Sequence, residues 1–287
     1  MSDKASAQLT KTAASSNVAY VSVYYRLYAP DGPMLVKQPC VPGNSYIGRI
    51  AASSIPPPHT AETVKRRILA NEGRKEDTTR IANRLIGVTA SIFETVFEES
   101  ALPAHAAVGI PGVSSGNWSL RGGVGRTAES PVAVVFENNE ADYFHRVAAQ
   151  HGGLSPTSVK SSDYLFYHLY TPDGEGVSKK PITTDKPAIG SIPKNFIPAP
   201  HSASTIRRCI AAQEDYIYAG AKVFKDIGDT QGYQIPDKQG YLWEQRRYVS
   251  REQHIDLGKA DSVGTLDKPI VLVAEESKAA GSGCVVQ

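Results

Sequence analysis

Cys284 is the residue of this sequence whose chemistry is easiest to name. It begins Cys284-Val285-Val286-Gln287, which fits the C-a-a-X pattern of a prenylation site, and Gln in the last position favours a farnesyl group. The preceding residues 278–283 are mostly small and predict an accessible, flexible tail. We therefore expect farnesylation at Cys284 and contact with the cytosolic face of a membrane. The alternative is an accidental C-terminal sequence.

A single lipid chain gives only weak, reversible membrane binding, and stable attachment needs a second signal. The candidates for that signal are basic residues on the outward faces of two expected helices: Lys65, Arg66, Arg67, Arg207 and Arg208. They offer a surface for an acidic protein or an anionic lipid head group. An ordinary solvated helix face is the alternative. A Tyr-rich edge strand near residues 19–28 is a further candidate for binding a partner strand.

The composition argues against several classes of function. The net charge is +2 with both signs well mixed, so no basic field favours nucleic acid. The cysteines Cys40, Cys209 and Cys284 form no C-x-x-C pair, so we expect neither a disulfide framework nor a zinc site. The Gly-rich segment 121–126 lacks the Lys of a phosphate-binding loop. We expect no cofactor, no secretory signal at residues 1–17 and no membrane-spanning segment.

The elements that must position these side chains arise from a duplication. Residues 25–32 match residues 167–174 at a separation of 142 positions, and further segments keep this separation without a gap. Near the end of each copy, residues 131–135 match 269–273 at a separation of 138. A repeat of about 140 residues is too long for a solenoid unit and has the size of a domain. The chain therefore contains two diverged copies of one domain.

The patterns of copy one predict strands around a single helix. Alternating Val and Tyr residues predict a strand over 19–28, and Pro-Asp-Gly then predicts a turn. Further extended segments are expected at 34–41, 46–51, within 81–97, and at 132–136. The helix is expected over 61–71, with Thr60 as its N-cap and Gly73 closing its end.

Copy two repeats this plan. Its helix is expected to begin after Ser202 and to end near Gln213, with Ile206 and Ile210 facing inward. Strands are expected at 216–224 and 269–274. The two copies therefore share their scaffold elements. Positions at which the copies differ are not required for that scaffold.

His59 and His201 are the histidines that recur at the same position in both copies. A catalytic His needs a carboxylate or nucleophile in register, but Glu62 of copy one is replaced by Ser204 in copy two. We therefore expect both rings to be structural, stacked on the Pro run with Nδ1 bonded to the backbone. The enzyme alternative places a site between the copies, with candidates from copy two only: Trp243, Arg246, Arg247, His254 and Asp256.

The order hairpin, helix, strand, loop and final strand resembles the β-grasp, or ubiquitin-like, fold. The segment 55–73 is similar to the helix region of ubiquitin. This resemblance implies an α+β protein with two tandem β-grasp-like domains. The whole tandem also resembles an uncharacterised group of basidiomycete fungal proteins, through residues 25–32, 47–50, 56–60 and 263–273. That second resemblance implies family and kingdom and no activity.

We expect five segments: a disordered tail (1–17), the first β-grasp-like domain (18–138), a short helix and linker (139–161), the second domain (162–276) and a flexible tail with the C-a-a-X box (277–287). The function that fits them is a non-enzymatic protein-interaction or adaptor protein with an unidentified protein partner. The alternatives are an enzyme with a site between the copies and a soluble structural protein with an accidental C-terminus.

Overall fold

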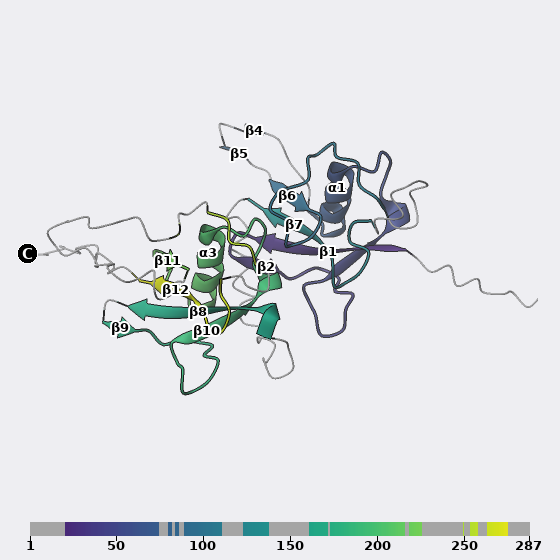
Figure 1. Cartoon of the computed structure of the whole chain (residues 1–287). Helices are drawn as coiled ribbons and strands as arrows, with labels where there is room; N and C mark the ends of the chain where they lie inside the picture. Colours follow the sequence, from purple (N-terminus) through teal and green to yellow (C-terminus); the bar gives the residue numbers. More distant parts are fainter. Residues whose placement is uncertain are drawn as a thin grey trace, which may run out of the picture.

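Among the described residues, each copy forms a five-stranded mixed β-sheet with one α-helix, an α+β arrangement, and β4 (Arg80–Ile81) and β5 (Arg84–Leu85) of copy one form a separate two-stranded sheet (Figure 1). The computed structural model describes residues 21–74, 80–81, 84–85, 89–110, 123–137, 161–171, 173–215, 218–225, 249, 253–257 and 263–274. The expected tails (1–17 and 277–287) and residues 139–160 of the expected linker lie outside these described residues.

Copy one is built around a central strand, β1. Its elements are β1 (Ser22–Ala29), β2 (Gly32–Met34), β3 (Gly48–Ala51), the 3₁₀ turn η1 (Ala52–Ser54), α1 (Ala61–Asn71), β4 (Arg80–Ile81), β5 (Arg84–Leu85), β6 (Ala90–Phe93) and β7 (Val132–Phe136). Strand β1 pairs antiparallel with β2 and β3 and parallel with β7, which pairs antiparallel with β6. The first and last strands of the copy therefore lie side by side. The prediction of an unpaired Tyr-rich edge strand near residues 19–28 is wrong, because this strand has neighbours on both sides.

Copy two repeats this topology. Its elements are η5 (Ser161–Asp163), β8 (Tyr164–Thr171), β9 (Gly174–Glu175), β10 (Ile189–Pro193), η6 (Lys194–Phe196), α3 (Ala203–Gln213), β11 (Lys222–Phe224) and β12 (Ile270–Val273). Strand β8 takes the place of β1, with β12 as its parallel neighbour. Leu27 faces Val134 in copy one and Leu169 faces Leu272 in copy two, so the register is the same.

Both helices begin at the predicted caps. The Thr60 side chain accepts a hydrogen bond from the Thr63 backbone N–H, and the Thr63 hydroxyl accepts one from the Thr60 N–H, a reciprocal capping box. In copy two the Ser202 hydroxyl oxygen accepts from the Thr205 backbone N–H at 3.1 Å. Such a cap contributes about 1 kcal/mol to stability. The predicted helix over 61–71 and the predicted end at Gln213 are confirmed.

Each helix covers one face of its own sheet. In copy one, Val64 and Ile68 of α1 pack against Leu27 and Val134 in one apolar core. Copy two has a separate core of the same kind, which includes Ile206, Ile210, Leu169 and Leu272. Strand β7 is buried on both faces, because the face of the copy-one sheet away from α1 receives copy two.

Two predicted strands are shorter than expected. The return strand over 34–41 pairs with β1 only as far as Met34. Beyond it the chain turns away, because the Lys37 backbone N–H donates to the Glu72 carboxylate and Pro39 and Pro42 have no N–H to donate. The strand expected over 216–224 forms at Lys222–Phe224, after a turn at 218–220.

Candidate functional site at the contact between the two copies

A tyrosine–glutamate network is the most extensive buried polar feature shared by the copies. In copy two, Glu214 is 1% exposed and accepts hydrogen bonds from the Tyr167 hydroxyl at 2.6 Å and the Ser178 hydroxyl at 2.7 Å. The Lys179 backbone N–H donates to its other oxygen at 2.8 Å. Gln213 Nε2 donates to the Tyr167 hydroxyl at 2.6 Å. One carboxylate thus joins the sheet, the helix end and the hairpin loop.

Copy one has the same network with fewer donors. Glu72 accepts from the Tyr25 hydroxyl and, at 2.8 Å, from the Lys37 backbone N–H, while Asn71 Nδ2 donates to Tyr25 at 2.9 Å. Burial, followed by the neighbouring glutamate, raises the pKa of Tyr25. A neutral phenol is a donor that stabilises the carboxylate. In each copy the network ties the end of the helix to the central strand and to the loop that follows the hairpin.

The sequence contained the signal for this network. Glu72 and Glu214 lie 142 positions apart, the same separation as Tyr25 and Tyr167, yet they were not singled out. Each tyrosine also faces a glycine on the neighbouring strand, which is Gly48 in copy one. A Cβ on Gly48 would lie 2.3 Å from the Tyr25 ring, so only glycine leaves room for that ring. The repeated Tyr–Gly pair is therefore a packing requirement.

The contact between the copies begins with two buried side chains of β1. Arg26 Nη1 and the Tyr28 hydroxyl both donate to the Asn195 backbone oxygen of copy two, each at 2.7 Å. Arg26 is 4% exposed and Tyr28 is fully buried. Burial raises the pKa of Tyr28 to about 12, so the phenol stays a donor at neutral pH. Two desolvated donors on one carbonyl fix how η6 sits on copy one.

Apolar contacts complete this part of the interface. The Phe196 ring lies 5.9 Å from the Arg26 guanidinium and, edge-on, 5.0 Å from the Tyr46 ring. Ala199 of copy two belongs to a buried cluster with five copy-one residues: Tyr28, Phe93, Val96, Ala133 and Val135. Strand β2 also lies beside α3 (Figure 1). The outer face of the copy-one sheet is therefore covered by the pre-helix loop of copy two (residues 197–201).

A histidine pair extends the contact beyond the sheet. The rings of His201 and His254 stack with centroids 6.4 Å apart, and the Phe97 ring of copy one meets His201 edge-on at 5.9 Å. His254 Nδ1 lies 3.3 Å from a carboxylate oxygen of Glu99, also from copy one. The pKa of His201 is lowered from 6.5 to about 4, mainly by burial, and the nearby His254 contributes in the same direction. His201 is therefore neutral in this contact at physiological pH.

Neither ring is fully hydrogen-bonded. His201 bonds the backbone of Ile197, as the sequence analysis expected of a structural ring. The Nε2 atoms of His201 and His254 are buried and find no hydrogen-bond partner among the described residues. A neutral His201 ring tolerates this arrangement better than a charged one, because an unpaired buried charge costs far more than an unpaired neutral nitrogen.

His254 has a structural counterpart in copy one that sequence comparison missed. The Ile255 backbone N–H donates to the His201 oxygen at 2.8 Å, and the Val108 N–H donates to the His59 oxygen at 2.9 Å in the same way. Ala107 forms the bridge to Thr60 that His254 forms to Ser202. The backbone position is shared, and the imidazole is specific to copy two. The offset between these segments differs from 142, which hid the match.

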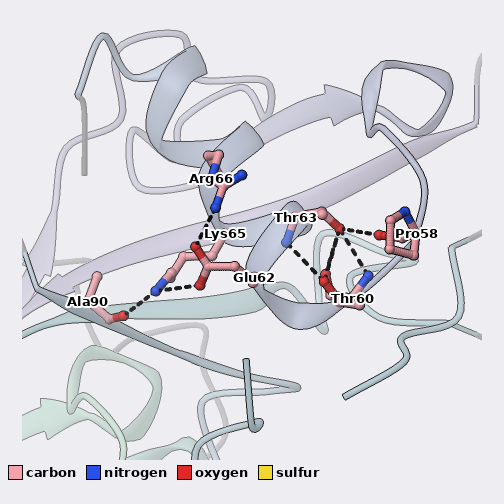
Figure 2. Close-up of polar contacts among 7 residues, drawn as sticks. All are labelled: Pro58, Thr60, Glu62, Thr63, Lys65, Arg66 and Ala90. Carbon is pink, nitrogen blue, oxygen red and sulfur yellow. Dashed lines mark hydrogen bonds and ion pairs between the residues drawn. The ribbon is translucent and has the colours of Figure 1, made fainter. Parts of the chain in front are cut away.

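The predicted basic residues of α1 are largely engaged within copy one. Figure 2 shows Glu62 held by Lys65 at 3.0 Å and Arg66 at 3.2 Å, with Lys65 also donating to the Ala90 backbone oxygen. Arg67 donates to the Ser54 hydroxyl at 3.0 Å. The Arg66–Glu62 ion pair involves an exposed arginine and contributes little to stability. Of this group, only the Arg66 side chain is exposed.

In α3, as in α1, basic residues are either engaged within their own copy or exposed to solvent. Arg207 Nη1 approaches the Ala221 backbone oxygen at 3.5 Å, whereas Arg208 is exposed. Arg66 and Arg208 occupy matching positions of the repeat. The structure therefore reduces the predicted basic surface to one exposed arginine per copy.

The other candidates are only partly described. Cys284, Trp243, Arg246 and Arg247 lie outside the described residues. His254 and Asp256 are described and lie at the contact, where the Asp256 charge raises the pKa of His201. Cys209 is buried, which raises the pKa of its thiol well above the usual range and makes it unreactive. Within the described part of the chain, no cluster of three metal-ligating side chains is present.

The chain matches no protein-family model, no curated protein and no solved structure. No helix among the described residues has the length and hydrophobicity needed to cross a bilayer.

Proposed function

We propose that this chain is a non-enzymatic protein-interaction protein made of two β-grasp-like modules and carried to the cytosolic face of a membrane by a farnesyl group on Cys284. The observation that carries the proposal is the contact between the copies. One module binds the other through desolvated anchors, Arg26 and Tyr28, on an apolar sheet face. Buried Arg and Tyr anchors of this kind are typical of protein-binding surfaces.

The topology supports the choice of module. In each copy the first and last strands form a central parallel pair, a hairpin strand flanks it, and one helix lies across the sheet. A central parallel pair with one helix across the sheet supports a β-grasp-like module. Modules of this plan bind partners through a sheet edge or the helix face, an inference by fold-level analogy. Arg66 and Arg208 are the exposed cations that such a partner, or an anionic lipid, would meet.

Prenylation is tested by growing cells that express the full chain with an alkyne-tagged farnesyl precursor. We expect label on the wild type and on Cys40→Ser, and none on Cys284→Ser. The membrane-bound fraction of Cys284→Ser should fall at least several-fold, because the farnesyl chain supplies most of the membrane affinity. Equal labelling or equal fractionation of the wild type and Cys284→Ser would refute this part of the proposal.

Protein binding is tested by proximity labelling with the intact chain, with Cys284→Ser, and with Arg66→Glu combined with Arg208→Glu. We expect a set of neighbours that depends on Cys284 and a subset that also depends on the two arginines. Neighbours that are the same for all three chains would contradict an adaptor role. Turnover of a small molecule by the purified chain, abolished by His254→Ala, would instead favour the enzyme alternative.

A further inference from the structure

We propose that the contact between the two copies is acid-sensitive, and that His201, packed against His254, holds the pre-helix loop of copy two on copy one only while its ring is neutral. The location of His201 makes the contact sensitive to charge. His201 lies in the loop that copy one binds, is 1% exposed, and packs between Phe97 of copy one and the His254 ring. Any charge on His201 in the closed contact is therefore a buried charge beside a second imidazole.

The charged groups near His201 differ in how well they would compensate for a positive charge on its ring. Glu99, from copy one, is adjacent to His254 and is largely exposed. Asp256, from the segment 253–257, favours a charge on His201, but it is also shared with Lys194 of η6. The only aromatic ring that copy one presents to His201 is that of Phe97 among the described residues, and it is uncharged. Protonation of His201 therefore works against its burial and against the neighbouring His254.

The sign of the effect follows from the two states of the contact. In the closed contact burial holds the pKa of His201 near 4, and when the loop is released the ring returns to its ordinary value of 6.5. The open state then binds protons more readily, so the stabilisation of the closed contact is fully present above pH 6.5 and is lost as the pH falls toward 4. Between pH 7.5 and pH 5.0 the ratio of closed to open contact should fall about 30-fold.

The two pre-helix loops supply a matched internal reporter. In copy two the Ile197 and Ser202 amides donate to Lys194 and Pro200 oxygens at 3.2 and 2.8 Å. In copy one the equivalent amides of Ile55 and Thr60 donate to Ala52 and Pro58 oxygens at 3.2 and 2.9 Å, in a loop that contains the exposed residues Pro56–Pro58. Both pairs report the same kind of turn, but only one turn rests on the other copy.

The experiment is amide hydrogen exchange on the full chain at pH 7.5 and pH 5.0, corrected for the intrinsic pH dependence of exchange. We expect protection of Ile197 and Ser202 to fall about 30-fold in the wild type, whereas Ile55, Thr60 and the core strands keep theirs. His201→Asn should abolish the fall, since the amide keeps a donor for the Ile197 oxygen and does not titrate.

His59→Asn is the matched control at the same position of copy one, and it should respond to pH as the wild type does. His254→Ala gives copy two the Ala that copy one has at Ala107; it should shrink the fall and leaves the core of the module untouched. The proposal is overturned if Ile197 and Ser202 keep their protection at pH 5.0, if both loops lose it equally, or if His201→Asn loses it as fully as the wild type.

Discussion

The pre-helix loops of the two copies have the same backbone and opposite surroundings. In copy one, Pro57 is exposed and His59 is half-buried; in copy two, Ala199 and His201 are buried against the other copy. The outer faces of the two sheets also differ. Arg26, which anchors the loop on copy one, corresponds to His168 in copy two. The copies therefore kept their internal network and diverged where one binds the other. Such a contact is heterologous, with a different surface from each partner.

The largest expected effect tests what the copies share. Gly190→Ala would place a Cβ 2.3 Å from the Tyr167 ring, which is buried and hydrogen-bonded at its hydroxyl. We expect a loss of about 3 kcal/mol in unfolding free energy, measured by urea denaturation, and a similar loss for Gly48→Ala in copy one. Gly220→Ala, where the added Cβ meets nothing within 4 Å, is the control and should change stability by less than about 0.5 kcal/mol. A tolerated Gly190→Ala would show that the ring can move aside.

The second-largest expected effect tests how the tyrosine–glutamate network of copy two differs from that of copy one. Glu214→Ala leaves the buried hydroxyls of Tyr167 and Ser178 without their acceptor, and we expect a cost of about 2 kcal/mol. Glu72→Ala should cost about 1 kcal/mol, because Glu72 is less buried and Val36 stands where copy two has Ser178. Urea denaturation with a probe in each copy resolves the two values. Equal costs would mean that the serine hydroxyl adds nothing.

The smallest effect isolates the contact itself. Tyr28→Phe removes one of two donors to the Asn195 oxygen and should cost about 1 kcal/mol, read as reduced protection of the copy-two loop in hydrogen exchange. Tyr170→Phe, the matched change in copy two, should have no such effect, because the described residues show no hydrogen bond from the Tyr170 hydroxyl. If both variants behave alike, the hydroxyl of Tyr28 does not hold the copies together.

Local sequence signals predicted the helices accurately. Thr60 and Ser202 cap them, and the spacing of Val64 and Ile68 identified the buried face, because capping and helical periodicity depend only on nearby residues. The predicted return strand was too long for the opposite reason. Its Lys37 N–H is taken by Glu72, 35 residues away, and no local pattern reveals such a competitor.

The contact site was predicted only in fragments. His254 and Asp256 were candidates because copy two alone has them, and His201 was expected to be structural through a backbone bond, which it makes. Arg26, Tyr28 and Phe196 were missed as contact residues. Arg, Tyr and Phe residues also occur in the strands and turns of a single domain that binds nothing. Only the packing of one copy on the other brings these three side chains together. Cys284 stays a prediction.

The parallel pairing of first and last strands has a consequence for synthesis of the chain. Leu27 pairs with Val134, so copy one cannot complete its sheet until β7 has left the ribosome. The copy-two loop that covers this sheet emerges about 60 residues later, a delay on the order of 3 to 12 s at usual elongation rates. During that interval Tyr28 and Phe93 have no cover from copy two. Because copy one precedes copy two in the chain, the sheet face that receives the loop is synthesised first and the loop that covers it is synthesised second.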